Sequence, residues 1–278
     1  AKLKGQIRIS GSKNASLPIL AATLLSNKKI SLTNLPRVKD VETMIKLLES
    51  MGSKVKVSKN KNTLVIKNDK KIKTEASYNL MSTMRAGIIV LGPLLARFGK
   101  ARVSSPGGCN IGFRPIDIHL EALKKMGVKY KIIDGYINAN AKNGLVGAKI
   151  KFPKISVGAT ENLMIAACLA KGQTVLSNCA IEPEIKDLSN FLCSIGAKIV
   201  WTGRRQVKII GIKTFKQSNY KIMFDRIEAG TMLVAAAVNQ GNLKLTGIET
   251  DILKTEINVL KKIGAKIIQK KNEIIIQG

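Results

Sequence analysis

The chain has 278 residues, of which 45% are hydrophobic and 4% aromatic, and its formal net charge is +29. A chain of this length can bury a large aliphatic core in one or two domains. No apolar run reaches the ~18 residues of a membrane span, and the basic, then alternating first residues are unlike a signal peptide. The four cysteines lack the spacing of a disulfide framework or zinc site, and His119 is the single histidine. We therefore expect a cytoplasmic protein that uses no metal or other cofactor.

The excess of lysine and arginine raises the question of a nucleic-acid partner. These lysines are spread over predicted turns and helix ends and do not form one tract, and few aromatic side chains are present for base stacking. We expect neither a nucleic-acid nor a membrane partner, although a basic nucleic-acid-binding module stays open as an alternative. The positive charge would attract anionic small molecules by long-range steering.

The predicted elements, in chain order, form a unit of helix, strand, helix and two strands that occurs four times. The first helices are predicted at 15–25, 83–97, 160–170 and 229–239, and the strands after them at 29–33, 100–104, 173–177 and 242–246. An amphipathic second helix then ends at a glycine, about 70 residues after the previous one, at Gly52, Gly127, Gly196 and Gly264. Two alternating runs complete each unit as a hairpin, such as 54–57 with 63–67 or 265–269 with 273–277. A repeat of this length predicts an α/β module that cannot bury its apolar face alone.

The loop 106–115 of the second unit contains a cysteine between glycines. Its three glycines allow a sharp backbone turn, and their N–H groups can bind an anion. Arg114 adds a planar fork of donors that suits a carboxylate or phosphate. A cation and oriented amides would lower the pKa of the Cys109 thiol. The spacing alone leaves two interpretations open: a reactive cysteine beside an anionic substrate, or a glycine-rich turn with an incidental cysteine.

Basic residues also occur where predicted helices begin. Lys13 and Asn14 lie at the start of the first helix, which is a natural anion site, although Asn14 could be an ordinary N-cap. Arg85 begins an apolar helix, where a cation is unfavourable. It therefore indicates either an anionic partner or an interdomain salt bridge. The segment 154–160 could bind a ligand or cap the third helix, and the charges of 225–228 could serve a site or a domain junction.

The single histidine and two of the cysteines are ambiguous by position. His119 follows the cysteine loop and could bond a substrate, or be an ordinary partly buried histidine. Cys168 lies in an apolar helix and Cys193 beside a repeat glycine, so both are interpreted as inert core residues.

With GSKNA, TMRAG, PGGCNIGFRP, KISVGAT and DRIEAGT in this order, the chain resembles the UDP-N-acetylglucosamine 1-carboxyvinyltransferase family over essentially its whole length. The resemblance implies an inside-out α/β barrel of repeated βαβαββ-type modules, in two domains of three modules each. It implies a complete first domain at 14–224, which holds the cysteine loop at 106–115. Residues 1–13 and 225–278 would form a partial second domain of one module.

The resemblance also implies an enzyme of peptidoglycan synthesis, and hence of cell-wall biogenesis, cell shape and cell division. Such an enzyme transfers the enolpyruvyl group of phosphoenolpyruvate to the 3′-hydroxyl of UDP-N-acetylglucosamine by addition and elimination. Cys109 would be the proton donor, would form a covalent pyruvate adduct and would be alkylated by fosfomycin. Contacts to phosphoenolpyruvate would come from Lys13, Asn14 and Arg114. The sugar nucleotide would be held by Arg85, Arg114, Pro115, Ile116, Asp117, Ile118, Lys154, Ile155, Ser156 and Val157.

The chain departs from that family by ending after the fourth of six modules, before the family's candidate general base. We therefore expect a monomeric fragment with little or no turnover by itself. One alternative is the shikimate-pathway enolpyruvyl transferase, which shares the architecture, and another is a non-catalytic protein that only binds UDP-N-acetylglucosamine. The cysteine loop and the KISVGAT segment favour the sugar-nucleotide enzyme.

Overall fold

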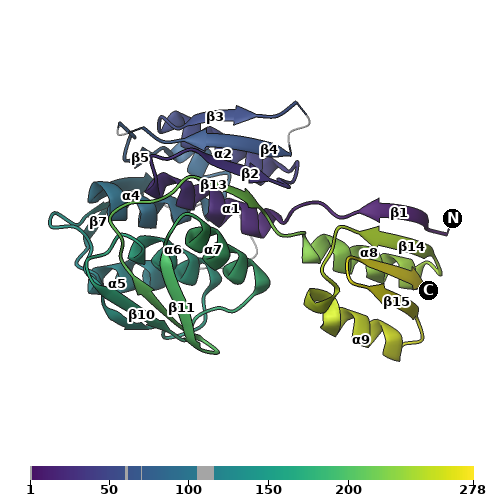
Figure 1. Cartoon of the computed structure of the whole chain (residues 1–278). Helices are drawn as coiled ribbons and strands as arrows, with labels where there is room; N and C mark the ends of the chain where they lie inside the picture. The colour runs from purple at the N-terminus through teal and green to yellow at the C-terminus, as the bar shows by residue number, and fades with distance from the viewer. Residues whose placement is uncertain (1, 60–61, 70, 105–115) are drawn as a thin grey trace.

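The computed structural model describes residues 2–59, 62–69, 71–104 and 116–278. For Arg85 it describes the backbone and not the side chain. It has a larger lobe and a smaller lobe joined by two crossing segments of chain (Figure 1). No helix in the described part of the chain is long and apolar enough to cross a membrane.

The four predicted units are confirmed. The first contains β1 (Lys4–Arg8), α1 (Lys13–Ala22), η1 (Thr23–Leu25), β2 (Ile30–Thr33), α2 (Lys39–Ser50), β3 (Lys54–Val57) and β4 (Thr63–Lys67). The second contains β5 (Glu75–Ala76), α3 (Tyr78–Met81), η2 (Arg85–Val90), α4 (Leu91–Phe98), β6 (Lys100–Ser104), α5 (Asp117–Lys125), β7 (Lys129–Ile133) and β8 (Tyr136–Asn140). The third contains β9 (Lys149–Lys151), α6 (Val157–Ala167), β10 (Gln173–Ser177), α7 (Pro183–Ser194), β11 (Lys198–Gly203) and β12 (Gln206–Ile210). The fourth contains β13 (Ser218–Lys221), α8 (Arg226–Val238), β14 (Asn242–Thr246), η3 (Thr250–Leu253), α9 (Lys254–Lys262), β15 (Lys266–Lys270) and β16 (Glu273–Gln277).

Helix boundaries differ from the prediction for local reasons. Helices α1, α6 and α8 begin two or three residues early, because the side chains of Ser12, Ser156 and Asp225 cap them. The helix predicted at 83–97 is divided into η2 and α4. At this division the Asn162 side chain accepts the Gly92 N–H at 2.7 Å and donates to the Ile88 carbonyl at 3.1 Å. The Asn162 side-chain amide therefore takes the place of the backbone hydrogen bond that would join the Gly92 N–H to the Ile88 carbonyl in a continuous helix.

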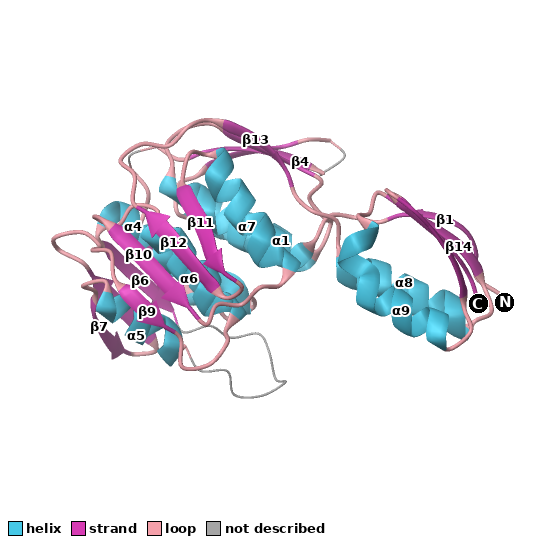
Figure 2. Ribbon diagram, turned by 60° about the horizontal axis from the view of Figure 1, so that its bottom comes forward, coloured by secondary structure: helices cyan, strands magenta, loops and turns pink. Residues whose placement is uncertain are grey.

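The described residues form four sheets with the same strand order, namely β13-β2-β4-β3, β5-β6-β8-β7, β9-β10-β12-β11 and β1-β14-β16-β15. In each sheet the first strand of this order is parallel to its neighbour, and the other pairs are antiparallel. None of these sheets closes into a barrel within the described residues. Figure 2 shows strands on the outside of the larger lobe and α1, α6 and α7 behind them, which is the expected inside-out arrangement. The helices α1 and α6 are buried from Ala15 to Ala22 and from Ala159 to Ala167, as helices that are mostly apolar on every side require. The buried polar residues among them are Ser16, Thr160, Glu161 and Asn162.

Two strands are exchanged between the lobes. β1 precedes α1 but pairs with β14 in the smaller lobe, and β13 precedes α8 but pairs with β2 in the larger lobe. The chain therefore crosses twice between the lobes, and the two crossings lie side by side. Ser12 N donates to Met223 O at 2.8 Å, and Asp225 N donates to Ser10 O at 2.8 Å. This antiparallel contact positions the first residues of α1 and α8 next to each other.

The buried apolar side chains form two separate clusters. The larger cluster extends from Ala15 to Ile222 and fills the centre of the larger lobe. The smaller cluster combines Ile9 with residues from Phe224 to Ile276. Each lobe thus has a hydrophobic core of its own.

Candidate functional site

A cavity of about 600 Å³ lies where six helices begin, a volume typical of small-molecule sites. It is lined by residues at the starts of α1, α2, α5, α6, α7 and α8, each a capping, first or second residue of its helix, namely Lys13, Asp40, Ile116, Ser156, Glu182 and Arg226. A helix N-terminus presents unpaired N–H groups and the positive end of the helix dipole. The convergence of six such ends makes this cavity suited to an anionic ligand.

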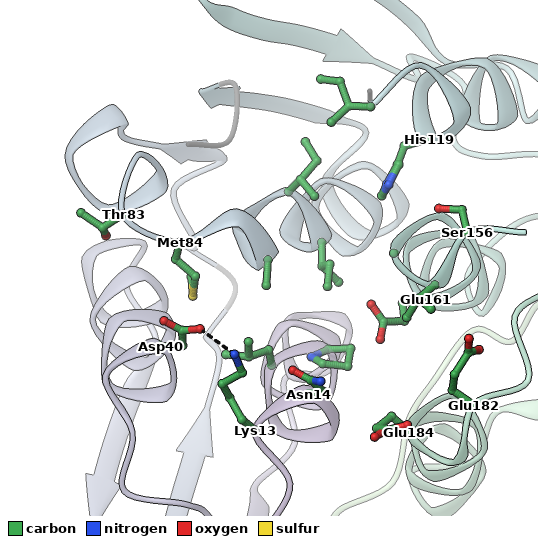
Figure 3. Close-up of a pocket in the computed structure, with 18 of the residues that line it drawn as sticks. Lys13, Asn14, Asp40, Thr83, Met84, His119, Ser156, Glu161, Glu182 and Glu184 are labelled. Atoms are coloured by element: carbon green, nitrogen blue, oxygen red, sulfur yellow. Dashed lines mark ion pairs between the residues drawn. The ribbon is translucent and has the colours of Figure 1, made fainter. Parts of the chain in front are cut away.

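Lys13 and Asn14, which the sequence predicts at the start of the first helix, both line the cavity. Ser12 is the N-cap of α1, and its hydroxyl accepts a hydrogen bond from Ala15 N at 3.2 Å. The ordinary-cap interpretation of Asn14 is therefore wrong, and Asn14 is an exposed residue at the mouth of the site. The Lys13 ammonium lies 3.3 Å from the Asp40 carboxylate (Figure 3). A ligand anion would share Lys13 with this carboxylate.

The segments predicted to hold the sugar nucleotide reach the cavity only in part. Ser156 and Val157 line it, and so does Ile116. Lys154 and Ile155 are exposed and lie outside the cavity lining. Asp117 and Ile118 belong to the first turn of α5 and are also absent from the lining.

Four of the predicted site residues have no described side chain. Cys109, Arg114 and Pro115 lie outside the described residues. For Arg85 only the backbone is described, as the first residue of η2. Its neighbours Met84 and Ala86 line the cavity, so η2 begins beside the site.

His119 is buried, lines the cavity and is oriented by Asn162. The Asn162 oxygen accepts the Gly92 N–H, so its nitrogen is the atom that donates to Ile88 O and to His119 Nδ1, both at 3.1 Å. A neutral imidazole that accepts at Nδ1 carries its hydrogen on Nε2. Across the ring, a Cβ added to Gly158 would lie 3.2 Å from His119 Cε1. The glycine therefore permits the close approach of α5 and α6.

Sequence reasoning missed the acidic side chains of the cavity. Glu161, Glu182 and Glu184 line it together with Asp40. The Glu184 carboxylate binds Arg226 Nε at 3.0 Å. This ion pair joins α7 of the larger lobe to α8, so Arg226 contributes to both the site and the junction. A charged residue within the apolar helix α6 was the one sequence signal for Glu161.

The described cysteines lie outside the cavity lining. Burial raises the pKa of Cys179 to about 12 and the pKa of Cys168 still further. Cys193 is exposed on α7, so its interpretation as a core residue is wrong, although partial burial of its thiol still raises its pKa. A raised pKa disfavours the thiolate, which is the nucleophilic form of each of these three residues.

The sequence profile of the EPSP synthase (3-phosphoshikimate 1-carboxyvinyltransferase) family matches residues 1–278. A protein of Pelagibacter ubique named UDP-N-acetylglucosamine 1-carboxyvinyltransferase is 70% identical over 100% of this chain and 66% of its own length. A protein of Saccharophagus degradans with the same name is 49% identical over 96% of this chain and 63% of its own length. The chain thus spans roughly two thirds or less of these relatives.

Solved structures with the same fold include enolpyruvyl transferases. The enolpyruvyl transferase NikO from Streptomyces tendae superposes with a TM-score of 0.88 at 19% identity, over 99% of this chain and 66% of that protein. An EPSP synthase from Acinetobacter baumannii superposes with a TM-score of 0.81 at 18% identity, over 100% of this chain and 65% of that protein. At these identities the likeness concerns the fold alone.

Proposed function

Because the chain belongs to the EPSP synthase family, we propose that its cavity is part of an enolpyruvyl-transfer site for phosphoenolpyruvate and UDP-N-acetylglucosamine. The observation that carries the proposal is the convergence of six helix N-termini on one cavity that contains Lys13 and Asn14. A phosphate, a carboxylate and a diphosphate all need such donors. The names of the relatives with 70% and 49% identity support the sugar nucleotide over shikimate 3-phosphate as the acceptor.

In the proposed reaction the 3′-hydroxyl of the sugar loses its proton as its oxygen bonds to C2 of phosphoenolpyruvate, while C3 gains a proton. Loss of a proton from C3 and of inorganic phosphate from C2 then restores the double bond, so the hydroxyl proton is the one released overall, to phosphate or solvent. We assign proton donation to Cys109 and contacts to phosphoenolpyruvate to Lys13, Asn14 and Arg114. Donors fixed before the reaction stabilise charge as it develops, without reorganising.

We assign the sugar nucleotide to the rim of the cavity and to the wall opposite Lys13 and Asn14. Ile116, Ser156 and Val157 would contact it within the cavity. The uridine end would extend beyond the lining, toward Asp117, Ile118, Lys154 and Ile155. Pro115 is assigned to the same ligand. Arg85 would contact the same ligand from the start of η2.

The two lobes fit the proposed domains, 14–224 and 1–13 with 225–278. Each lobe has its own apolar cluster, and the crossings at 9–12 and 222–225 lie between them. Within this proposal the protein is cytoplasmic, because its substrates are cytoplasmic metabolites, and it acts as a monomer.

Calorimetric titration of the 278-residue chain tests this function. We expect UDP-N-acetylglucosamine to bind, shikimate 3-phosphate not to bind, and Lys13→Ala to weaken phosphoenolpyruvate binding about tenfold, as loss of a charge-assisted hydrogen bond does. Lys262→Ala removes an equal charge from the exposed end of α9 and serves as the control. Binding of shikimate 3-phosphate in preference to the sugar nucleotide would overturn the assignment.

A further inference from the structure

Glu161 has a buried carboxyl group in the lining of a cavity suited to anions. The residue lies in the second turn of α6 and is 4% exposed. Figure 3 shows its side chain pointing into the cavity, in the space between α1 and the start of α7. Within residues 2–59, 62–69, 71–104 and 116–278, no group forms a hydrogen bond or ion pair with its carboxyl. A buried polar group without a partner carries a desolvation cost, so this orientation indicates a ligand contact.

The two cations whose described side chains line the cavity with Glu161 are already paired with other carboxylates. Lys13 on α1 binds Asp40 on α2, and Arg226 on α8 binds Glu184 on α7. Among the described residues of the facing elements, no other titratable group forms an ion pair with the Glu161 carboxyl. His119 on α5 accepts a hydrogen bond from Asn162, and one carboxyl oxygen of Glu182 is buried without a hydrogen-bond partner among the described residues.

These surroundings favour the neutral form of Glu161. Burial, together with the negative charges of Glu184 and Glu182, raises its pKa well above the ordinary value. A neutral carboxyl group has an O–H donor that a carboxylate lacks. The group can therefore contact an anion that an ionised glutamate would repel.

We propose that Glu161 contacts the bound ligand as a neutral acid and donates a hydrogen bond to one of its anionic oxygens. This inference rests on the proposed function. It adds Glu161 as a hydrogen-bond donor, a residue that is not in the motifs that indicated that function. The oxygen belongs to a phosphate or carboxylate, which either phosphoenolpyruvate or the diphosphate of the sugar nucleotide can supply. Loss of the Glu161 proton at higher pH removes the donor and adds a repulsive charge.

Two substitutions separate the donor from the charge. Glu161→Gln keeps the size of the side chain and donates at every pH, whereas Glu161→Ala removes the donor. Glu121→Gln is the matched control, because Glu121 is exposed on α5 and bonds Tyr130 at 2.9 Å. Each form of the 278-residue chain is titrated calorimetrically with phosphoenolpyruvate and, separately, with UDP-N-acetylglucosamine at several pH values between about 6 and 9.

At the acid end we expect Glu161→Ala to weaken binding of one ligand by about tenfold, the cost of one hydrogen bond to a charged group. The affected ligand identifies which anionic oxygen is contacted. We expect the affinity of the unmodified chain to fall, relative to Glu161→Gln, as pH rises. The comparison with Glu161→Gln cancels the ionisation of the ligand itself, and Glu121→Gln should behave like the unmodified chain.

The outcomes distinguish this inference from the function on which it rests. If the unmodified chain binds neither ligand, the proposed function fails and the inference fails with it. If it binds but both Glu161 variants match it at every pH, Glu161 is not a ligand contact and the proposed function stands. Should Glu161→Ala fail to fold, as judged by circular dichroism, the pH dependence of Glu161→Gln alone decides.

Discussion

At the scale of single residues, the site combines groups of opposite charge. Lys13 and Arg226 lie at helix N-termini, where cations are unfavourable without an anionic partner. Asp40 and Glu184 supply that partner in the free protein. Each cation is therefore oriented by a carboxylate before an anionic ligand binds. Binding of the ligand would weaken the ion pair between that cation and its carboxylate.

Glu161 makes the free energy of unfolding depend on pH. Its pKa is raised in the folded state, so between its ordinary value of 4.5 and the raised value the folded chain binds more protons than the unfolded chain. The free energy of unfolding must then fall as pH increases through that interval. We expect the stability of Glu161→Gln, measured by urea unfolding, to rise relative to the unmodified chain above about pH 4.5. Parallel stability profiles for the two forms would contradict this assignment.

At the scale of elements, the crossing of two chain segments fixes how the lobes join. Gly11 lies in this crossing and forms an isolated antiparallel β-bridge with Phe224. A Cβ at this position would come 1.6 Å from the Asn34 backbone oxygen, which cannot move without shifting the crossing. The geometry of the cavity, where α1 and α8 begin, thus depends on one residue without a side chain.

A pair of glycine substitutions tests this dependence. We expect Gly11→Ala to lower the free energy of unfolding by about 1–3 kcal/mol or more, as overpacking of a rigid core does. Gly230→Ala is the matched control, since a Cβ within α8 would come no closer than 3.8 Å to Glu256. There we expect no loss, or a gain of up to about 1 kcal/mol from helix propensity. Equal effects of the two substitutions in thermal or urea unfolding would show that the crossing is not constrained.

The regular elements could be predicted from local pattern, whereas the shape of the site could not. Strands β6, β10 and β14 match their predicted ranges because alternation is a property of neighbouring residues. The break between η2 and α4 depends on Asn162, about 70 residues away in the chain. The site shows the same division between local and distant causes. Local motifs indicated Lys13, Ser156 and Val157 but none of the carboxylates that line the cavity. The carboxylates meet only because separate helices begin at one point.

At the scale of the whole molecule, the two cores differ in size and exposure. The smaller lobe has the smaller apolar cluster. It also exposes apolar side chains on its helices, with Val238 82% exposed on α8 and Ile263 71% exposed at the end of α9. Because apolar burial dominates stability, we expect the smaller lobe to be the less stable one.

Unfolding followed by two probes tests whether the lobes are independent domains. Trp201, the single tryptophan, lies on β11 in the larger lobe, so its fluorescence reports that lobe alone. Far-UV circular dichroism reports helices and strands of both lobes. We expect an early urea transition in circular dichroism that fluorescence does not show. Coincident transitions would indicate one cooperative unit.

The most direct test of the central claim is intact-mass analysis after treatment with fosfomycin, with and without UDP-N-acetylglucosamine. In the proposed enolpyruvyl-transfer site Cys109 is the reactive thiol, whereas burial raises the pKa of the three other thiols. We predict a single adduct, mapped to Cys109 and formed faster with the sugar nucleotide. An adduct on Cys193, or a rate that UDP-N-acetylglucosamine leaves unchanged, would contradict the account.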